Sequence, residues 1–347
     1  MLVVKVGIIG ATGYGGAELL RILQSHPAFT IAAIYSSSQQ GKDITAHYPH
    51  LSHLSMTLDE IHPEAIAKQT DIVFLGVPSG ISAEIAPSLL KAGCTVIDLS
   101  GDFRLKNIEQ YEKWYNKKPA PKEWVDQAVY AMPEINRSAI KQDTKFISNP
   151  GCYPTATLLG LAPVVQNKLA KEGSIIIDAK SGVSGAGQTA SFGTIYSELN
   201  ENFKIYKVNQ HQHIPEMEQM LSTWGYEAPI TFSTHLVPMT RGIMSTIYVS
   251  LASSVDQDKI EQLYMEFYKD EPFIRIRNNN QFPATKEVFG SNYCDIGFLL
   301  DERTGRLTIV SVIDNLMKGA AGQAVQNANI LCGLDETAGL QLSPVYP

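Results

Sequence analysis

The amino-acid sequence predicts an α/β protein with a parallel sheet in its first 150 residues and a second, α+β domain after it. Three observations support this fold class. Short apolar runs alternate with helical patterns up to about residue 150, a glycine-rich turn joins the first strand to the first helix, and the later strands have fewer helices between them. Strands that alternate with helices form βαβ units, and nearly continuous apolar strands belong to sheets covered on both faces.

In the first part of the chain, the apolar run that ends at Ile9 predicts a buried strand, and Leu19, Leu20 and Leu23 predict one face of a helix. The residues between 106 and 127 are polar and rich in aromatic side chains, which indicates a surface excursion. Strands are expected over residues 2–9, 29–35, 71–77 and 95–99, and helices over residues 15–25 and 83–92.

In the later part of the chain, two strands are separated by a Pro-Gly turn at residues 238–242, which predicts a hairpin over residues 230–252. The segment from 315 to 331 is rich in alanine and is expected to be a long helix. Strands are expected over residues 174–179, 230–236, 244–252 and 307–314.

The composition is that of a globular protein without a broad nucleic-acid surface. Of the 347 residues 44% are hydrophobic, and 28 basic against 35 acidic side chains leave a formal charge of −7. Nucleic-acid binding needs a basic face, whereas a small anionic substrate needs only a few local cations. No apolar run approaches the roughly 20 residues of a membrane span, and the N-terminus lacks the features of a signal peptide. We expect neither nucleic-acid nor membrane partners.

The cysteines indicate a reducing compartment, and we expect a cytoplasmic protein. They are far apart and form no C-x-x-C pair, so neither a disulfide framework nor a structural zinc site is expected. The histidines at 47, 50 and 53 form a loose group that we interpret as a solvated loop, and we expect no metal site. The four cysteines are Cys94, Cys152, Cys294 and Cys332.

The glycine-rich segment GIIGATGYGG, residues 7–16, lies where the first strand ends and the first helix begins. Glycines there permit a tight turn and allow backbone N–H groups at a helix N-terminus to approach a pyrophosphate. The spacing is not the strict G-x-G-x-x-G, and a plain glycine-rich turn is the alternative. Its position favours dinucleotide binding, with contacts expected from Gly10, Thr12, Gly13, Tyr14 and Gly15.

The end of the second strand favours NADP over NAD. Tyr35 is followed by three serines, with Lys42 soon after, and no carboxylate stands there to bind the ribose hydroxyls or to repel a 2′-phosphate. Ser36 and Ser38 are therefore expected to contact the cofactor. A clear NAD preference in kcat/KM would contradict this interpretation.

Cys152 is the candidate nucleophile. It stands in SNPGCYPTAT, residues 148–157, where Pro154 suits the first position of an apolar helix. A thiol just ahead of a helix N-terminus is stabilised as the thiolate by the helix dipole and free N–H groups, which lower its pKa. The other three cysteines are interpreted as inert core residues.

His211 and His213 are the only closely spaced histidines followed by a proline and a carboxylate, Glu216, at the start of a predicted helix. Imidazole carries protons near neutral pH, and Glu216 could hold one ring through its N–H. Either histidine could be the acid/base, because residues two positions apart can lie on opposite faces.

Other candidate residues lie in turns. Arg104 and Arg241 could clamp anions through bidentate contacts, the alternative being ordinary salt bridges. The loop with Ser184 and Gly185 could lie along the nicotinamide or the substrate. The dipeptide Pro78–Ser79 ends a strand, at the edge of a parallel sheet where ligands bind.

Taken together, these motifs resemble the N-acetyl-γ-glutamyl-phosphate reductase family. The matching segments follow the order of the family and cover nearly the whole chain. They are GATGYGG at 10–16, DLSGDFR at 98–104, NPGCYPT at 149–155, SGVSGAG at 181–187, HQHIPE at 211–216 and DNLMKGA at 314–320.

The resemblance implies a Rossmann domain, 1–150 with 315–347, whose C-terminal helix returns to it, and a catalytic and oligomerisation domain, 151–314. It implies a homo-oligomer, dimer or tetramer, that uses NADP in arginine biosynthesis. Its small-molecule partners would be an acyl phosphate and inorganic phosphate. It also implies acid/base work by His213, substrate contacts by His211 and Asn149, and a cofactor contact by Asn315.

A thiolate divides the reduction of an acyl phosphate into two easier steps. Cys152 would attack the acyl carbon, expel phosphate and form a thioester, which hydride from NADPH would reduce to the aldehyde. Aspartyl phosphate and a carrier-linked aminoadipyl phosphate are alternative substrates for the same chemistry. A cofactor-free Cys-His thiol hydrolase and a non-catalytic NADPH sensor are alternatives of other classes.

Overall fold

The computed structural model describes residues 3–346, which form two compact units. Unit 1 extends to Gly151 and includes Ala320–Gln341, whereas unit 2 contains Cys152–Gly319 and the residues from Leu342 onward. Leu2, which the sequence analysis includes in the first strand, lies outside the described residues.

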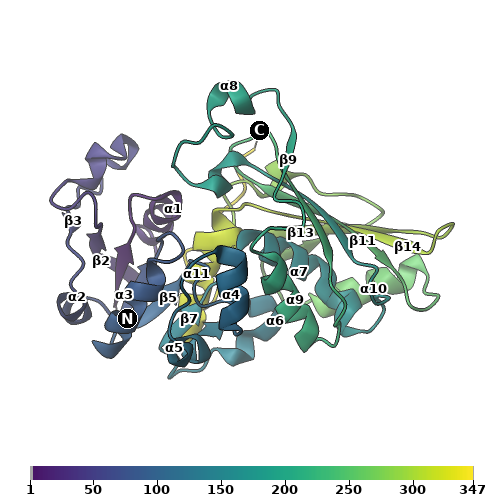
Figure 1. The fold of residues 1–347 in the computed structure, drawn as a ribbon, viewed down its shortest axis with the longest axis horizontal. Helices are drawn as coiled ribbons and strands as arrows, with labels where there is room; N and C mark the ends of the chain where they lie inside the picture. Colours follow the sequence, from purple (N-terminus) through teal and green to yellow (C-terminus); the bar gives the residue numbers. More distant parts are fainter. Residues whose placement is uncertain (1–2, 347) are drawn as a thin grey trace. The chain divides into compact units, whose positions relative to one another are not determined.

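Unit 1 is built on a seven-stranded parallel sheet with the order β3-β2-β1-β4-β5-β7-β6 (Figure 1). The order runs outward from β1 in both directions, and ligands of such sheets bind beyond the carboxyl ends of the strands where the order reverses. The strands are β1 (Val4–Ile9), β2 (Phe29–Tyr35), β3 (Leu58–Asp59), β4 (Ile72–Leu75), β5 (Thr95–Asp98), β6 (Val129–Tyr130) and β7 (Phe146–Ser148).

The helices of unit 1 connect these strands, as the alternating pattern predicts, and the expected strands and helices are confirmed with small shifts at their ends. The alanine-rich segment forms α11, which follows a π-helical turn at Met317–Ala321 and packs on α1 and β5 within this unit. The helices are α1 (Tyr14–Leu23), α2 (Pro63–Gln69), α3 (Ser82–Lys91), α4 (Ile108–Tyr115), α5 (Lys122–Gln127), α6 (Pro133–Asn136) and α11 (Gly322–Leu331).

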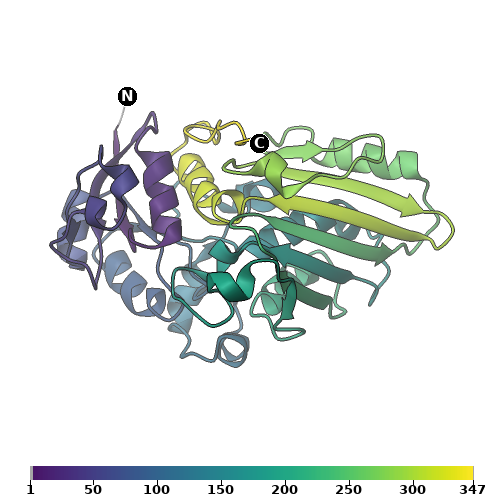
Figure 2. The same cartoon turned by 90° about the horizontal axis from the view of Figure 1, so that it is seen from above.

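Unit 2 is built on a seven-stranded mixed sheet with the order β12-β13-β14-β11-β8-β10-β9 (Figure 2). Along β11 the inward residues from Ile243 to Val249 are buried, and those between them are half-buried, the alternation of a sheet with one covered face. The strands are β8 (Ile176–Ser181), β9 (Lys204–Tyr206), β10 (Thr231–Leu236), β11 (Ile243–Ser250), β12 (Ile274–Ile276), β13 (Cys294–Asp301) and β14 (Arg306–Ile313).

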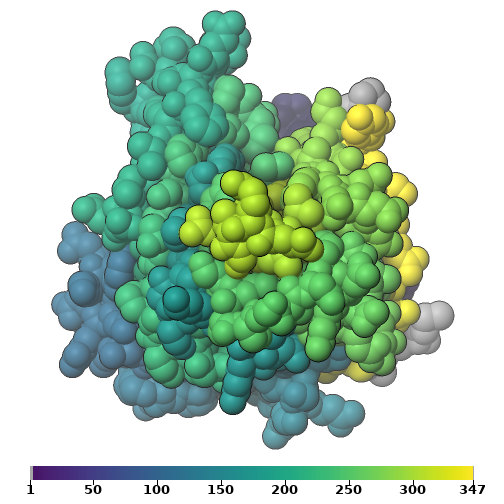
Figure 3. All heavy atoms as spheres, turned by 90° about the vertical axis from the view of Figure 1, so that its right-hand side faces the viewer, coloured from purple at the N-terminus to yellow at the C-terminus, as the bar shows by residue number. Residues whose placement is uncertain are grey.

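In unit 2, α9 and α10 pack on the long α7, which in turn packs on β11 and β14. Gly160 permits this close approach, since a Cβ there would lie 3.0 Å from the Cδ1 atom of Ile247. The segment around α8 projects from the unit (Figures 1 and 3). The helices are α7 (Cys152–Gln166), α8 (Tyr196–Leu199), α9 (Ile214–Thr223) and α10 (Gln257–Phe267).

The predicted hairpin over residues 230–252 is wrong. β10 and β11 lie on opposite sides of β8, parallel and antiparallel to it. The turn between them crosses the end of β8, where the N–H of Gly182 donates to the carbonyl of Gly242 and that of Ser184 to the carbonyl of Thr240. The strands at the edges of this sheet pair with segments that are remote in the sequence. No local pattern of residues indicates such a pairing.

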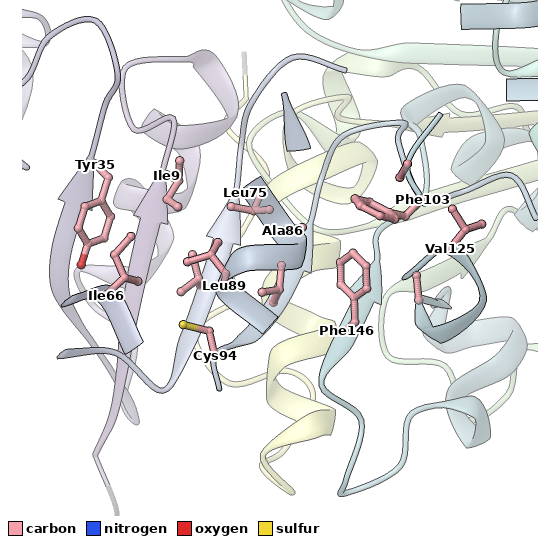
Figure 4. Packing of buried hydrophobic residues seen from close by; sticks show 14 of the residues in the cluster. Ile9, Tyr35, Ile66, Leu75, Ala86, Leu89, Cys94, Phe103, Val125 and Phe146 are labelled. Carbon is pink, nitrogen blue, oxygen red and sulfur yellow. The ribbon is translucent and has the colours of Figure 1, made fainter. Parts of the chain in front are cut away.

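The core of unit 1 lies between the sheet and its helices, and Figure 4 shows Leu75 of β4 with Leu89 of α3 in this cluster. The segment 106–127 is not only a surface excursion, because Tyr111 and Val125 are each 1% exposed. The hydroxyl of Tyr111 donates to Asp102 at 2.7 Å. Because most residues of this segment are polar, the sequence does not reveal the two buried side chains that fix the segment to the core.

Among residues 3–346, no helix combines the length and the apolar character needed to cross a membrane.

Candidate active site

Cys152 is the first residue of α7, the helix whose next residues, from Tyr153 to Val165, are all buried. The helix begins two residues earlier than the proline at 154 suggests, so the thiol lies on the first turn itself. Its surroundings in unit 2 are tight, because a Cβ added to Gly319 would lie 2.8 Å from the Cβ of Cys152. The half-buried thiol thus stands where the helix dipole favours an anion.

A cavity of about 450 Å³ opens beside Cys152 within unit 2. Its wall brings together Cys152 and both histidines of the HQH segment, which the sequence separates by about sixty residues. The charged residues that line it, apart from these titratable groups, are Lys204 and Lys207, and no carboxylate lines it. A cavity of this charge suits an anionic ligand.

His211 is buried, with 4% of its surface exposed. Burial lowers its pKa to about 3, and the positive charge of Lys207 acts in the same direction. The backbone N–H of His213 donates to its Nδ1 atom at 3.1 Å, so the proton of the neutral ring is on Nε2. His211 is therefore a neutral ring with a fixed N–H donor at ordinary pH.

His213 begins α9 as its N-cap, and Glu216 lies in the first turn of that helix. The Nε2 atom of His213 is 4.0 Å from the Oε2 atom of Glu216, which is longer than a hydrogen bond. Glu216 is 1% exposed. Its buried carboxylate therefore lies beside the His213 ring, where the sequence analysis expects it.

Two tyrosines complete the wall and were missed by the sequence analysis. The hydroxyl groups of Tyr153 and Tyr206 are 2.8 Å apart, and the ring of Tyr153 contacts those of His211 and Phe232 edge-on. Tyr206 belongs to β9, a strand of three residues that is too short to show a period in the sequence. In the sequence, Tyr153 cannot be distinguished from the other apolar residues of a buried helix.

Three predicted residues of unit 2 meet beside the turn that crosses β8. The amide of Asn315 donates to the hydroxyl of Ser184 at 3.0 Å and accepts from the backbone N–H of Gly242 at 2.7 Å. Gly185 lies next to them, since a Cβ there would be 3.7 Å from the amide nitrogen of Asn315. Ser184, Gly185 and Asn315 are thus brought together as one polar loop cluster.

Arg241 lies in the same turn and is fixed by a buried carboxylate. Its Nε atom lies 2.9 Å from Asp314, which is fully buried and also accepts the backbone N–H of Gly290 at 2.7 Å. Arg241 is thus the partner of an internal ion pair.

Arg104 and Asn149 lie together in unit 1. Arg104 donates to the carbonyls of Asn149 at 2.9 Å and Leu99 at 2.8 Å, and is 6% exposed. The side chain of Asn149 donates to Ala320 at 3.1 Å and accepts from Asn327 at 3.0 Å. These bonds hold the loop that leads from β7 to the nucleophile.

The glycine loop fits a pyrophosphate. Gly10 has φ +86°, and a Cβ there would lie 2.4 Å from the carbonyl oxygen of Gly76. Gly13 is the N-cap of the ten-residue α1 and offers no side chain to its N–H groups, which leaves a helix N-terminus of the kind that binds phosphate. The carbonyl of Thr12 accepts from Tyr48 at 2.8 Å, and Tyr14 is 39% exposed.

The other predicted cofactor residues lie beyond strand ends of the same sheet. The buried Ser36 accepts backbone N–H groups from Ser38 at 3.4 Å and Gln39 at 3.2 Å, so its hydroxyl shapes the turn after β2. Pro78 is exposed, and the hydroxyl of Ser79 accepts the N–H of Gly101 at 3.2 Å.

Two neighbouring glycines of α1 allow a matched test of the loop. A Cβ at Gly16 would lie 2.3 Å from the carbonyl of Gly10, whereas one at Gly15 would meet nothing within 4 Å. We expect Gly16→Ala to lower the free energy of unfolding by about 2–3 kcal/mol. Gly15→Ala is expected to leave it unchanged or raise it by up to about 1 kcal/mol, because alanine favours the helix. Chemical unfolding without cofactor measures both, and equal stabilities would contradict the loop geometry.

In the described part of the chain, no three histidine, cysteine or acidic side chains gather as metal ligands would.

Comparison with known proteins identifies the class. Residues 5–143 match the family model described as the semialdehyde dehydrogenase NAD binding domain, and residues 152–315 match the one described as its dimerisation domain. Among solved structures, aspartate semialdehyde dehydrogenase II from Vibrio cholerae, complexed with ASA, has a TM-score of 0.73 at 20% identity over 96% of this chain and 99% of that chain. The enzyme from Candida albicans with NADP has a TM-score of 0.71 at 19% identity, over 95% and 98%. This likeness shows the fold.

Closer relatives identify the branch. A protein of Geobacillus thermodenitrificans named N-acetyl-gamma-glutamyl-phosphate reductase is 58% identical over 99% of this chain and 100% of its own length. The protein of that name from Bacillus subtilis is 56% identical over the same shares. The chain therefore belongs to the N-acetyl-γ-glutamyl-phosphate reductases of the semialdehyde dehydrogenase family.

Proposed function

We propose that the protein reduces N-acetyl-L-glutamyl 5-phosphate with NADPH to N-acetyl-L-glutamate 5-semialdehyde and phosphate, a step of arginine biosynthesis. The name shared by relatives at 56–58% identity over full length supports this substrate. The same names do not favour aspartyl or aminoadipyl phosphate. The observation that carries the proposal is the thiol at the start of α7, beside a cavity that also holds His211 and His213.

The residues of the cavity have separate roles in the reaction. Cys152 attacks the acyl carbon, forms a thioester and releases phosphate. His213 moves the proton in the attack and in the final release of the thiol, and Glu216 favours the charged form of its ring. The neutral His211 donates from Nε2 to an oxygen of the substrate.

The anionic groups of the substrate need cations, and Lys204 and Lys207 lie on the cavity wall. We add them to the predicted substrate contacts of Arg104, Asn149 and Arg241. The two arginines are already bound in the structure, Arg104 to backbone carbonyls and Arg241 to Asp314, so both also have an anchoring role.

The cofactor is NADP, which supplies hydride to the thioester when bound in reduced form. The fit rests on the glycine turn at Gly10 and Gly13 and the open N-terminus of α1, which suit the pyrophosphate. Ser36 and Ser38 follow β2, where the adenosine ribose is bound in dinucleotide folds. Ser184, Gly185 and Asn315 in unit 2, with Pro78 and Ser79 in unit 1, are proposed contacts of the same ligand.

The two family models support the domain roles that we propose. Unit 1 is proposed as the dinucleotide-binding domain and unit 2 as the catalytic and oligomerisation domain. The proposed homo-oligomer, dimer or tetramer, uses the open face of the second sheet, where Ile176 is 43% and Leu299 37% exposed. The four cysteines, one of them the nucleophile, are in no disulfide, which supports a reducing cytoplasm.

The test is the reverse reaction. With N-acetylglutamate semialdehyde and inorganic phosphate, the protein is expected to reduce NADP, and to do so only when phosphate is present. Aspartate semialdehyde and NAD are the matched controls and are expected to give much lower kcat/KM. Equal activity on aspartate semialdehyde, or NADP reduction without phosphate, would overturn the proposed reaction.

A further inference from the structure

Asp314 is a buried carboxylate that has no part in the proposed reaction. It follows the last residue of β14, and none of its surface is exposed. A buried carboxylate is costly unless it is paired and hydrogen-bonded. Here both oxygens accept hydrogen bonds, and the donors come from three different segments of unit 2. The carboxylate therefore joins these segments at one point.

Two of the segments are remote from Asp314 in the sequence. The turn after β10 contributes Arg241, whose Nε atom lies 2.9 Å from the carboxylate. The loop before β13 contributes the backbone N–H of Gly290, which donates at 2.7 Å. The ring of Phe289, next to that glycine, lies 5.4 Å from the guanidinium of Arg241. The remote segments thus hold the carboxylate and each other.

The third segment is the turn that follows Asp314 directly. The backbone N–H groups of Leu316 and Met317 donate to the Oδ1 atom of Asp314 at 2.9 and 3.1 Å. The N–H of Gly319 donates to its backbone carbonyl at 3.0 Å. Aspartate caps such turns because its side chain accepts the N–H groups that the first turn leaves without partners. Asp314 therefore fixes the path of the chain from 315 to 319.

This turn ends against the nucleophile. A Cβ added to Gly319 would lie 2.8 Å from the Cβ of Cys152, 3.2 Å from its Cα and 3.3 Å from the Cδ1 atom of Ile313. The backbone of Gly319 is thus in close contact with the first residue of α7, with no space between them for a side chain. A movement of the turn would therefore move Cys152 as well.

We propose that Asp314 is a positioning residue for the thiol: it fixes the turn 315–319, and Gly319 in that turn holds the Cβ of Cys152 so that the sulfur stays at the cavity. The inference rests on Cys152 as the nucleophile of the proposed function. Displacing a reacting atom by about 1 Å can cost 10²-fold in rate, so a looser turn would slow the chemical step.

The test is Asp314→Asn, which keeps the shape of the side chain and removes its charge. We expect kcat to fall by about 10–100-fold and the KM for NADP to stay the same, because the glycine turn belongs to unit 1. Hydrogen exchange of the segment 315–319, followed by mass spectrometry, is expected to become about tenfold faster or more. Unchanged exchange in this segment would overturn the proposal.

Asp295→Asn is the matched control. Asp295 is equally buried and accepts from Arg275 at 2.6 Å, but it lies in β13. This variant is expected to keep kcat within about twofold and to speed exchange at β12, not at 315–319. Equal losses of kcat in both variants would show a general effect of removing a buried charge and would overturn the proposal.

Arg241→Gln separates the ion pair from the turn. It removes the cation and keeps the N–H donors of Leu316 and Met317 to the carboxylate. Exchange over 315–319 is expected to be slower in this variant than in Asp314→Asn. Equally fast exchange in the two variants would assign the order of the turn to the ion pair and overturn the direct role of the carboxylate.

Gly319→Ala tests the contact with the nucleophile itself. The added methyl group would displace Cys152 without changing the carboxylate, and we expect kcat to fall by about 100-fold or more. The double variant with Asp314→Asn is expected to lose no more than Gly319→Ala alone, because both changes act on the same contact. Losses that multiply would show two independent effects and would overturn the proposal.

Should Asp314→Asn fail to fold, the wild type still provides a test. The amides of Leu316, Met317 and Gly319 are expected to exchange as slowly as those of the central strands of unit 2, and fast exchange there would overturn the proposal. If the exchange results are as expected but the wild type lacks reductase activity, only the proposed function fails.

Discussion

Replacing Cys152 with alanine is expected to abolish turnover, with kcat lower by roughly 10⁴-fold or more, because nucleophile and covalent intermediate are lost together. Binding of NADP should persist, because the glycine turn and α1 belong to unit 1 and Cys152 to unit 2. Steady-state kinetics and cofactor titration by fluorescence measure the two effects separately.

Cys332→Ala provides the control. Cys332 is half-buried like Cys152, but burial raises its pKa, and it stands at the end of α11 instead of at the start of a helix. This variant should retain activity within about twofold, as substitutions away from special features usually do. Residual phosphate-dependent turnover in Cys152→Ala near that of the wild type would remove the thioester from the mechanism.

Replacing His213 with asparagine is expected to lower kcat by about 10²–10⁴-fold, the usual loss when a general acid/base is removed. The fall of activity on the acidic side of the pH profile should disappear with it, because the group that titrates is gone. The profile of kcat between pH 5 and 9 measures both effects.

His211→Asn separates the two histidines. Burial, and then the charge of Lys207, lowers the pKa of His211 to about 3, so the ring stays neutral over that whole range. This variant should raise KM through the lost N–H donor and keep the shape of the pH profile. If His211→Asn flattened the profile and His213→Asn did not, the two roles would be reversed.

The sequence predicted most of unit 1, because its strands are continuous apolar runs between helices. Unit 2 was harder, since strands such as β9 and β12 are only three residues long and pair with remote segments. The expected hairpin failed for the same reason: β8, some fifty residues earlier by position, occupies the place between β10 and β11. Pairing partners are tertiary information that local periodicity does not contain.

The candidate site shows the same division. The thiol and the two histidines were found from their local helix-start patterns, and the structure places them around one cavity. Their states depend on contacts across the fold: burial makes His211 neutral, and Asp314 holds Arg241. Tyr206 gave no signal, because a lone tyrosine in a short exposed segment is common. The roles of these residues depend on distances between atoms and on burial, which the amino-acid sequence alone does not give.

Gly319 has no functional group, yet its α-carbon leaves room for only a hydrogen next to Cys152, since a Cβ there would lie 2.8 Å from that of the cysteine. An evolving lineage of this protein can therefore exchange this glycine no more freely than a reactive residue of the cavity. A single methyl group at position 319 would displace the nucleophile, although no reactive group would be changed. The free space around Cys152 therefore limits the mutations that the enzyme tolerates as much as its reactive groups do.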